Sequence, residues 1–146
     1  MERIDLLGLI SENFHLNIFT HKESEKIPGA NFMSAIDYYS QMPYVFLHSK
    51  INLNITLRSI HSGIPLRAFD IMGCGGFLLT NFQEDFLDFF VPGEDYVYYE
   101  SKEDMLSKIE YYLSHDKERS DIAQSGLEKI KKFHSYVDRA KSIVEL

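Results

Sequence analysis

The clearest pattern of hydrophobic and polar positions lies at residues 51–58, INLNITLR, where apolar and polar side chains alternate without a break. A period of two predicts a β-strand with one apolar and one polar face. The polar face has two interpretations. It is a solvated sheet edge, or it is covered by helices like the apolar face, and its amide and hydroxyl side chains form hydrogen bonds with the walls of a site at the strand's carboxyl end. We favour the second interpretation, because Arg58 and His61 follow the strand directly.

Strands and helices alternate along the rest of the chain. Residues 4–10 have helical spacing, a short strand ends near Thr20, and residues 21–35 lack a period and are predicted to form a loop. Further helices are expected over 37–49, 65–73, 83–90 and 101–113, and further strands over 76–80 and 96–99. Pro43 should lie in the first turn of the helix over 37–49 or break that helix. Ser101 and Asp104 are predicted to form a capping box at the start of the helix over 101–113. Two more helices follow, the second opened by Ser135, and Lys129 is expected on a solvated helix face with no assigned chemistry. This order predicts an α/β fold, a Rossmann-like parallel sheet flanked by helices, whose ligands bind outside the carboxyl ends of the strands.

Length and charge narrow the function classes. The chain has 146 residues, 45% of them hydrophobic, which suits a single domain spanning 1–146 with a substantial core. A net charge of −7 argues against a nucleic-acid partner, because such proteins usually carry a basic stripe. Residues 44–80 are locally basic, since Lys50, Arg58 and Arg67 face Asp70 alone, giving +3 − 1 = +2. A basic window in an acidic domain fits a small anionic ligand.

Cysteine usage and hydropathy favour a cytoplasmic protein. Cys74 is the single cysteine, so no internal disulfide can form, and no zinc-type spacing occurs. No apolar run approaches the ~20 residues that would cross a bilayer, so we expect no membrane span. The chain begins in a helical pattern at Glu2, whereas a doubly wound domain normally opens with a strand. We therefore expect a fragment of a longer chain.

Residues 58–81, RSIHSGIPLRAFDIMGCGGFLLTN, carry the candidate binding chemistry. Gly63 permits a tight turn, and Pro65 suits the first position of a helix because its missing amide is not needed there. The backbone amides that follow, together with the forked guanidinium of Arg67, would attract a phosphate group. The alternative is an ordinary strand-to-helix connection with a surface arginine.

Three other features of this stretch each have two interpretations. Asp70, three residues after Arg67, either forms a surface salt bridge with it or accepts hydrogen bonds from ribose hydroxyls. The glycines around Cys74 either cap the helix or keep side chains away from a sugar, and the cap is favoured, with Cys74 a small apolar residue. His61 either exchanges a proton with a reacting group or, more commonly for a loop histidine, is a structural donor.

The segments INLNIT, SGIPLRAFDIMGCGGFLLTN and FVPGEDYVYY together resemble the CgeB-type spore-maturation glycosyltransferase-like family, over essentially the whole chain. That family is grouped with the group 1 glycosyltransferases of GT-B architecture. The resemblance implies the C-terminal, nucleotide-sugar-binding half of a two-domain enzyme, whose N-terminal acceptor-binding domain would be its partner. It also implies a bacterial role in making spore or cell-surface polysaccharide.

The resemblance further implies roles for particular residues. In the wider group, two glutamates with seven residues between them grip the donor; Asp70 takes the second position, and Ser62 departs from the pattern at the first. The backbone at Gly63 and Ile64 and the side chain of Arg67 correspond to the diphosphate cradle, and the segment from Ile36 to Tyr38 corresponds to part of the base pocket. The candidate substrate-binding residues are thus Ile36, Tyr38, Arg58, Ser62, Gly63, Ile64, Arg67 and Asp70.

We therefore expect the donor domain of a glycosyltransferase that takes a sugar from a nucleoside-diphosphate sugar, with Arg67 stabilising the leaving diphosphate. No metal or cofactor is expected, because the sequence has no paired-acid DxD pattern. The fragment alone should not turn over. Two alternatives remain: a non-catalytic nucleotide-sugar-binding or scaffold module, as Ser62 suggests, and a nucleotide-sugar epimerase-like enzyme.

Overall fold

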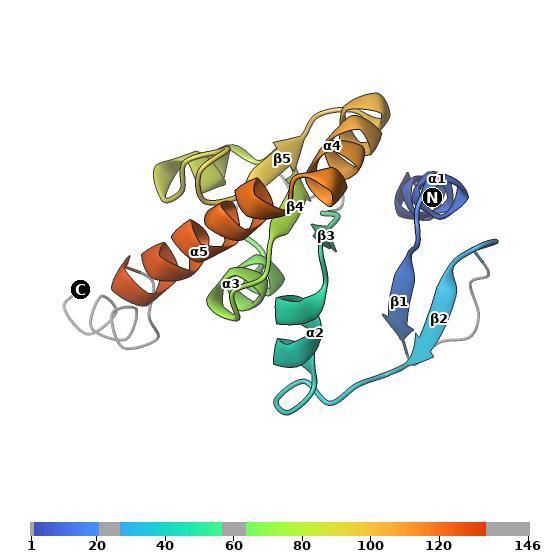
Figure 1. Cartoon of the computed structure of the whole chain (residues 1–146), viewed down its shortest axis with the longest axis horizontal. Helices are drawn as coiled ribbons and strands as arrows, with labels where there is room; N and C mark the ends of the chain where they lie inside the picture. Colours follow the sequence, from blue (N-terminus) through green and yellow to red (C-terminus); the bar gives the residue numbers. More distant parts are fainter. Residues whose placement is uncertain (1, 21–26, 57–63, 134–146) are drawn as a thin grey trace. The chain divides into compact units, whose positions relative to one another are not determined.

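A computed structural model of the chain describes residues 2–20, 27–56 and 64–133 (Figure 1). Contacts between residues divide the chain into two compact units, Met1–Met42 and Pro43–Leu146. Each unit contains its own parallel β-sheet and its own buried apolar residues. The predicted α/β fold, a parallel sheet flanked by helices, is confirmed.

The first unit consists of helix α1 (Glu2–Asn13) and two parallel strands, β1 (Asn17–Thr20) and β2 (Asn31–Ser34). Its buried apolar side chains are Leu6, Ile10, Leu16 and Ile27. The prediction of a loop over residues 21–35 is wrong for β2. All four β2 side chains are exposed, so the strand has no hydrophobic period and is held by its backbone pairing with β1.

The second unit has a three-stranded parallel sheet in the order β3-β4-β5. Its elements in chain order are α2 (Met42–His48), β3 (Asn52–Asn54), α3 (Leu66–Gly73), β4 (Leu78–Asn81), the 3-10 helix η1 (Glu84–Asp88), β5 (Val97–Tyr99), α4 (Lys102–Ser114) and α5 (Asp116–Phe133). Helix α3 packs against β3, β4 and α5, while α4 packs against β5 and α5 (Figure 1). The helix predicted over 37–49 begins only at Met42, so Pro43 lies in its first turn, one of the two alternatives, where its missing amide costs no helical hydrogen bond.

The polar face of β3 is buried, and its amides serve the packing of the second unit. Asn52 and Asn54 are only 7% and 8% exposed. The Nδ2 group of Asn52 donates to the carbonyl oxygens of Phe46, at 2.9 Å, and Phe77, at 3.3 Å. The side chain of Asn52 therefore ties α2 to the sheet and has its own buried N–H group satisfied. The alternative of a solvated sheet edge is wrong.

The C-terminal end of α3 is a glycine cap, as the favoured interpretation expected. Gly75 has a φ of 83°, in the left-handed region that favours glycine. The amide of Gly75 donates to the oxygen of Met72 at 3.1 Å, and that of Gly76 donates to the oxygen of Ile71 at 2.9 Å. These two bonds form a Schellman motif. A Cβ at Gly76 would lie 2.6 Å from the oxygen of Phe46, so this glycine allows close packing of the backbone.

An acid buried in the second unit links the segment before β5 to α5. The carboxylate of Asp95 accepts hydrogen bonds from Lys129 Nζ at 2.7 Å, Ser125 Oγ at 2.6 Å and the Val91 amide at 2.8 Å. From its position on the helix, Lys129 was expected on a solvated face without specific chemistry. That expectation is wrong, because its partner comes from a distant segment that helical periodicity does not reveal.

Candidate functional site

The carboxyl ends of β3 and β4 lie at one edge of the second sheet, because the two strands are parallel and in register, with Asn54 opposite Thr80. Ligands of parallel α/β sheets bind outside this edge. Polar side chains lie here and bond to one another. Asn54 Nδ2 donates to Thr80 Oγ1 at 3.1 Å and to Thr56 Oγ1 at 3.2 Å, and Asn81 Oδ1 accepts from the Thr56 amide at 2.8 Å.

Helix α3 begins near this edge, because it lies in the crossover between parallel strands β3 and β4. Pro65 precedes its first residue with φ −59° and ψ 139° and supplies no side-chain cap. The first turn contains no acidic residue. The amides of Leu66 and Arg67 have no hydrogen-bond acceptor among the described residues, and they carry the partial positive charge of the helix start.

Arg67 and Asp70 differ in their surroundings. The Arg67 side chain is exposed, and it makes no ion pair with any residue in the described part of the chain. The salt bridge that the i,i+3 spacing would permit between them is therefore not formed. Asp70 is half-buried in the middle of α3. The guanidinium remains available for an anion beside the amides of the same helical turn.

The remaining predicted substrate-binding residues fall into three groups. Ile64 is half-buried and immediately precedes Pro65. Ile36 and Tyr38 belong to the first unit, whereas α3 belongs to the second. The other three, Arg58, Ser62 and Gly63, lie outside the described residues, as does His61, the candidate for proton exchange.

The segment of the predicted base pocket has a defined turn. The Asp37 carboxylate accepts from the amide of Ser40 at 2.7 Å, from its hydroxyl at 2.7 Å and from the amide of Tyr39 at 3.1 Å. Hydrogen bonds from the side chain and amide of Ser40 hold the pKa of this carboxyl below its ordinary value. The turn leaves the Tyr38 ring 46% exposed and packed edge-on against the ring of Tyr39, with centroids 5.4 Å apart.

Cys74 does not have the surroundings of a nucleophile. Its side chain is half-buried directly after α3. Burial raises the pKa of the thiol, and the nearby charge of Asp70 raises it further. A raised pKa reduces the thiolate that would attack a substrate, in agreement with the interpretation of Cys74 as a small apolar residue.

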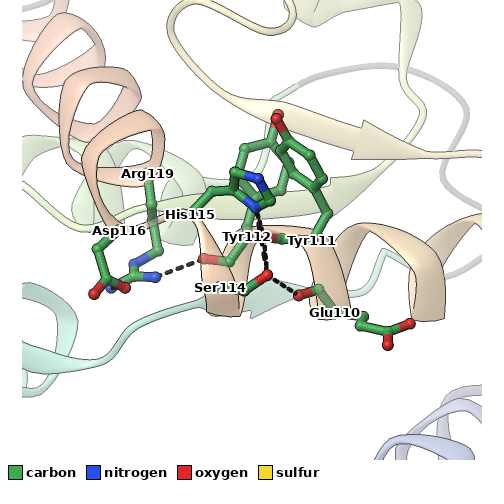
Figure 2. Close-up of polar contacts among 7 residues, drawn as sticks. All are labelled: Glu110, Tyr111, Tyr112, Ser114, His115, Asp116 and Arg119. Carbon is green, nitrogen blue, oxygen red and sulfur yellow. Dashed lines mark hydrogen bonds and ion pairs between the residues drawn. The ribbon is translucent and has the colours of Figure 1, made fainter.

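A second polar cluster, at the junction of α4 and α5, is structural (Figure 2). Ser114 Oγ donates to the carbonyl oxygens of Glu110 and Tyr111, at 3.1 Å and 3.0 Å. Arg119 Nη1 donates to the Tyr112 oxygen at 2.5 Å, and its Nη2 lies 2.8 Å from a carboxylate oxygen of Asp116. The contacts to the carbonyl oxygens of Tyr111 and Tyr112 satisfy groups in the last turn of α4, where no further helical amide follows to bond them.

Residues 2–20, 27–56 and 64–133 contain neither a metal-binding cluster nor a membrane-spanning helix. No group of three or more histidine, cysteine or acidic side chains there could hold a metal ion. In the same part of the chain, no helix has the length and apolar character required to traverse a bilayer.

The fold and this edge define a parallel α/β domain of the kind found in the C-terminal halves of GT-B glycosyltransferases. A family model described as glycosyl transferase-like matches residues 5–145, and the chain belongs to that family. No curated protein sequence matches the chain.

Solved structures share the fold at low sequence identity. The C-terminal domain of the group 1 glycosyl transferase LpcC from Francisella tularensis has a TM-score of 0.59 and 19% identity, over 74% of this chain and 55% of that one. Sucrose-phosphate synthase from Thermosynechococcus elongatus has a TM-score of 0.76 and 12% identity, over 97% of this chain and 40% of that one. HepE from Anabaena, solved with UDP-glucose, has a TM-score of 0.71 and 10% identity, over 98% of this chain and 44% of that one. The chain thus spans about half or less of the length of these proteins.

Sequence reasoning missed one residue of this edge, Asn81. The alternating pattern at residues 51–58 pointed to the polar residues of that strand, Asn52, Asn54 and Thr56. Asn81 ends a strand whose preceding residues are buried and apolar except for Thr80. The sequence could have indicated Asn81, because it is an amide side chain at the carboxyl end of a buried strand, and parallel sheets bind ligands at that end.

Proposed function

We propose that this chain is the donor-binding domain of a glycosyltransferase that uses a nucleoside-diphosphate sugar. The observation that carries the proposal is the start of α3, near the carboxyl edge of parallel strands, where backbone amides and the Arg67 guanidinium lie together without partners among the described residues. Membership of the glycosyl transferase-like family supports the same reaction class. The narrower proposal of a domain that binds a nucleoside-diphosphate sugar rests on the CgeB-type resemblance.

In this proposal the diphosphate binds at the α3 N-terminus. Its negative charge interacts favourably with the helix amides and with the two parallel N–H donors of Arg67. Asp70, one turn further along the same helix, accepts hydrogen bonds from the ribose hydroxyls. By the CgeB-type resemblance, Tyr38 belongs to the base pocket, where its exposed side chain could stack on the base. Transfer of the sugar releases a nucleoside diphosphate, and Arg67 stabilises the charge that develops on it.

The acceptor is bound, in this proposal, by an N-terminal domain of a longer protein. The share of the solved relatives that this chain covers, 40–55%, is consistent with that arrangement. The 146 residues would then form one functional domain that binds the donor and does not turn over by itself.

Calorimetric titration of the full chain with UDP, GDP and their sugars tests the donor site. We expect binding by at least one nucleotide of the panel and a loss of about 10- to 100-fold in its affinity for Arg67→Ala, because a charge-assisted hydrogen bond contributes about 1.5–3 kcal/mol. Lys131→Ala is the matched control, since Lys131 is an exposed cation on α5. Failure of every nucleotide to bind the unaltered chain would refute the donor site.

Turnover separates the enzyme from a non-catalytic module, the alternative that Ser62 favours by departing from the family pattern. Release of nucleoside diphosphate from a bound donor, in the presence of the acceptor-binding domain, is expected of the enzyme. Binding that is lost in both Arg67→Ala and Asp70→Ala, without turnover on any acceptor, identifies the module. Isomerisation of the sugar without an acceptor identifies the epimerase-like alternative.

A further inference from the structure

Four side chains at the carboxyl edge of β4 and β5 are linked by contacts, and we call them the aromatic platform: Phe82, Tyr98, Asp104 and Lys108. Phe82 directly follows β4, and its amide donates to the oxygen of Tyr99 at 3.0 Å, which continues the pairing with β5. The ring of Phe82 lies edge-on to the ring of Tyr98, with centroids 5.0 Å apart. Ligands of parallel α/β sheets bind outside this edge.

The Phe82 side chain is the apolar part of the platform that a ligand can reach, because the residue is 43% exposed. Its position is fixed from two sides. The backbone is bonded to β5, and the ring contacts Tyr98, whose own ring lies 6.4 Å from that of the buried Tyr96. An exposed ring that is already held gives up little conformational entropy when a ligand stacks on it.

An ion pair beside the rings supplies hydrogen-bonding groups. Lys108 Nζ lies 5.0 Å from the centroid of the Tyr98 ring, donates to the Tyr98 carbonyl oxygen and pairs with Asp104 Oδ2 at 3.0 Å. The Glu100 amide donates to the same Oδ2 at 3.0 Å. Asp104 Oδ1 and the third hydrogen of the ammonium group therefore have no hydrogen-bond partner among the described residues. Both side chains are partly exposed, at 35% for Asp104 and 31% for Lys108.

The chemistry of the platform fits a pyranose sugar. The C–H face of a pyranose ring is apolar and packs on an aromatic side chain. Its hydroxyls each donate and accept, so they match a carboxylate oxygen next to an ammonium group. The charges of Asp104 and Lys108 cancel within the pair, so the platform lacks the net positive charge that would favour a phosphate.

We infer that the aromatic platform is a saccharide-binding site, in which Phe82 stacks on a pyranose ring and the ion pair binds its hydroxyls. The inference goes beyond the proposed function, because none of these residues belongs to the α3 site. The saccharide is the acceptor, which would then contact this domain as well as the N-terminal one, or it is the sugar of the donor. Both sources have the same chemistry, and titration with each kind of ligand separates them.

Titration of the full chain with maltose, cellobiose, lactose and chitobiose, followed by the NMR shifts of backbone amides, tests an acceptor saccharide. We expect at least one of these disaccharides to bind and to shift the amide signals of Phe82 and Tyr98. Phe82→Ala should lower the affinity for that disaccharide about three- to tenfold, whereas Phe82→Tyr keeps a ring and should stay within about twofold of the unaltered chain. Lys108→Met should also lower it about three- to tenfold, because a hydrogen bond to a hydroxyl is lost.

Nucleotide titrations test the sugar of the donor. If the platform binds that sugar, Phe82→Ala should weaken a nucleotide-sugar about three- to tenfold and leave the matching nucleoside diphosphate unchanged. If it binds the acceptor, Phe82→Ala should weaken a disaccharide and leave both nucleotides unchanged. A loss of affinity for the nucleoside diphosphate itself would mean that Phe82 stacks on the base, and would overturn the inference.

Phe89→Ala is the matched control, since Phe89 is similarly exposed, at 50%, and is not part of the platform. The inference is overturned if no saccharide or nucleotide-sugar binds, or if Phe82→Ala binds all of them as tightly as Phe89→Ala does. It is also overturned if Phe82→Ala changes the sedimentation of the chain and not its saccharide affinity, because the ring would then belong to a protein interface.

The outcomes separate the inference from the proposed function. If the unaltered chain binds a disaccharide through Phe82 and no nucleotide, the proposed function fails and the saccharide site stands. If the chain binds nucleotides through Arg67 and Phe82→Ala changes no affinity, the saccharide site alone fails.

Discussion

Replacing Lys129 by methionine should destabilise the second unit by leaving a buried carboxylate without its counter-charge. The Asp95 side chain is 1% exposed, whereas that of Lys129 is 27% exposed, with 2.7 Å between Nζ and Oδ2. Methionine keeps most of the aliphatic stem and removes the charge. The change therefore isolates the ion pair from the packing of α5.

The expected loss follows from what remains around the carboxylate. Removing one partner of a fully buried ion pair costs about 3–5 kcal/mol. Asp95 keeps the hydrogen bonds from Ser125 and the Val91 amide, and the partial exposure of Lys129 means that water already screens the pair. We expect a decrease of about 2–3 kcal/mol in the free energy of unfolding.

Urea denaturation followed by far-ultraviolet circular dichroism measures this loss; the chain has no tryptophan for fluorescence. Lys131→Met, at an exposed position of the same helix, should change stability by less than about 0.5 kcal/mol. The double variant Asp95→Asn with Lys129→Met should recover most of the loss, because no buried charge remains. A Lys129→Met protein as stable as the Lys131→Met control would refute the reasoning.

The same pair predicts a dependence on pH. Burial raises the pKa of the Asp95 carboxyl, but the hydrogen bonds from Lys129, Ser125 and the Val91 amide outweigh it, and the pKa lies below its ordinary value. A folded-state pKa below that of the unfolded chain gives stability that is present above about pH 3.9 and lost as pH falls through the folded value. The difference between the unaltered protein and Lys129→Met should therefore be largest near neutral pH and shrink below about pH 4, as urea curves at several pH values will show.

Three further substitutions test packing and capping by the same urea measurement. Gly126→Ala should cost about 1–3 kcal/mol, because the new Cβ would lie 2.6 Å from the carbonyl oxygen of Asp95. Gly8→Ala should instead stabilise the first unit by up to about 1 kcal/mol, since nothing lies within 4 Å of its Cβ position in α1. Ser101→Ala should cost about 1 kcal/mol, because Ser101 Oγ accepts from the Asp104 amide at 3.1 Å. A change in stability of the opposite sign in any of these variants would contradict the reasoning for that position.

Local signals in the sequence determined much of the second unit. The capping pair of Ser101 and Asp104, the helix start after Pro65 and the glycine cap at Gly75 were all predicted from residue types at fixed spacing. Each depends on a backbone conformation that a few neighbouring residues impose on one another, so the sequence contains the necessary information. The same holds for the exposed Arg67 in the first turn of α3.

Contacts between distant segments were not visible in the sequence. Strand β2 has no hydrophobic period, because its side chains are exposed and β1 alone holds its backbone. Lys129 was expected on a solvated surface, yet it pairs with Asp95, more than 30 residues away. Pairing of this kind depends on how the elements pack, which no window of a few residues encodes.

The candidate site shows the same division. The sequence by itself determined that a helix begins after Pro65 with free amides and a cation, because chain geometry and residue type fix that arrangement locally. Only the tertiary structure decided that Asn52 and Asn54 are buried and that Asn81 holds the exit of β3. The physical reason is that an amide side chain can hydrogen-bond water or the backbone equally well, and only the packing of β3 beside β4 removes the water and selects its partner.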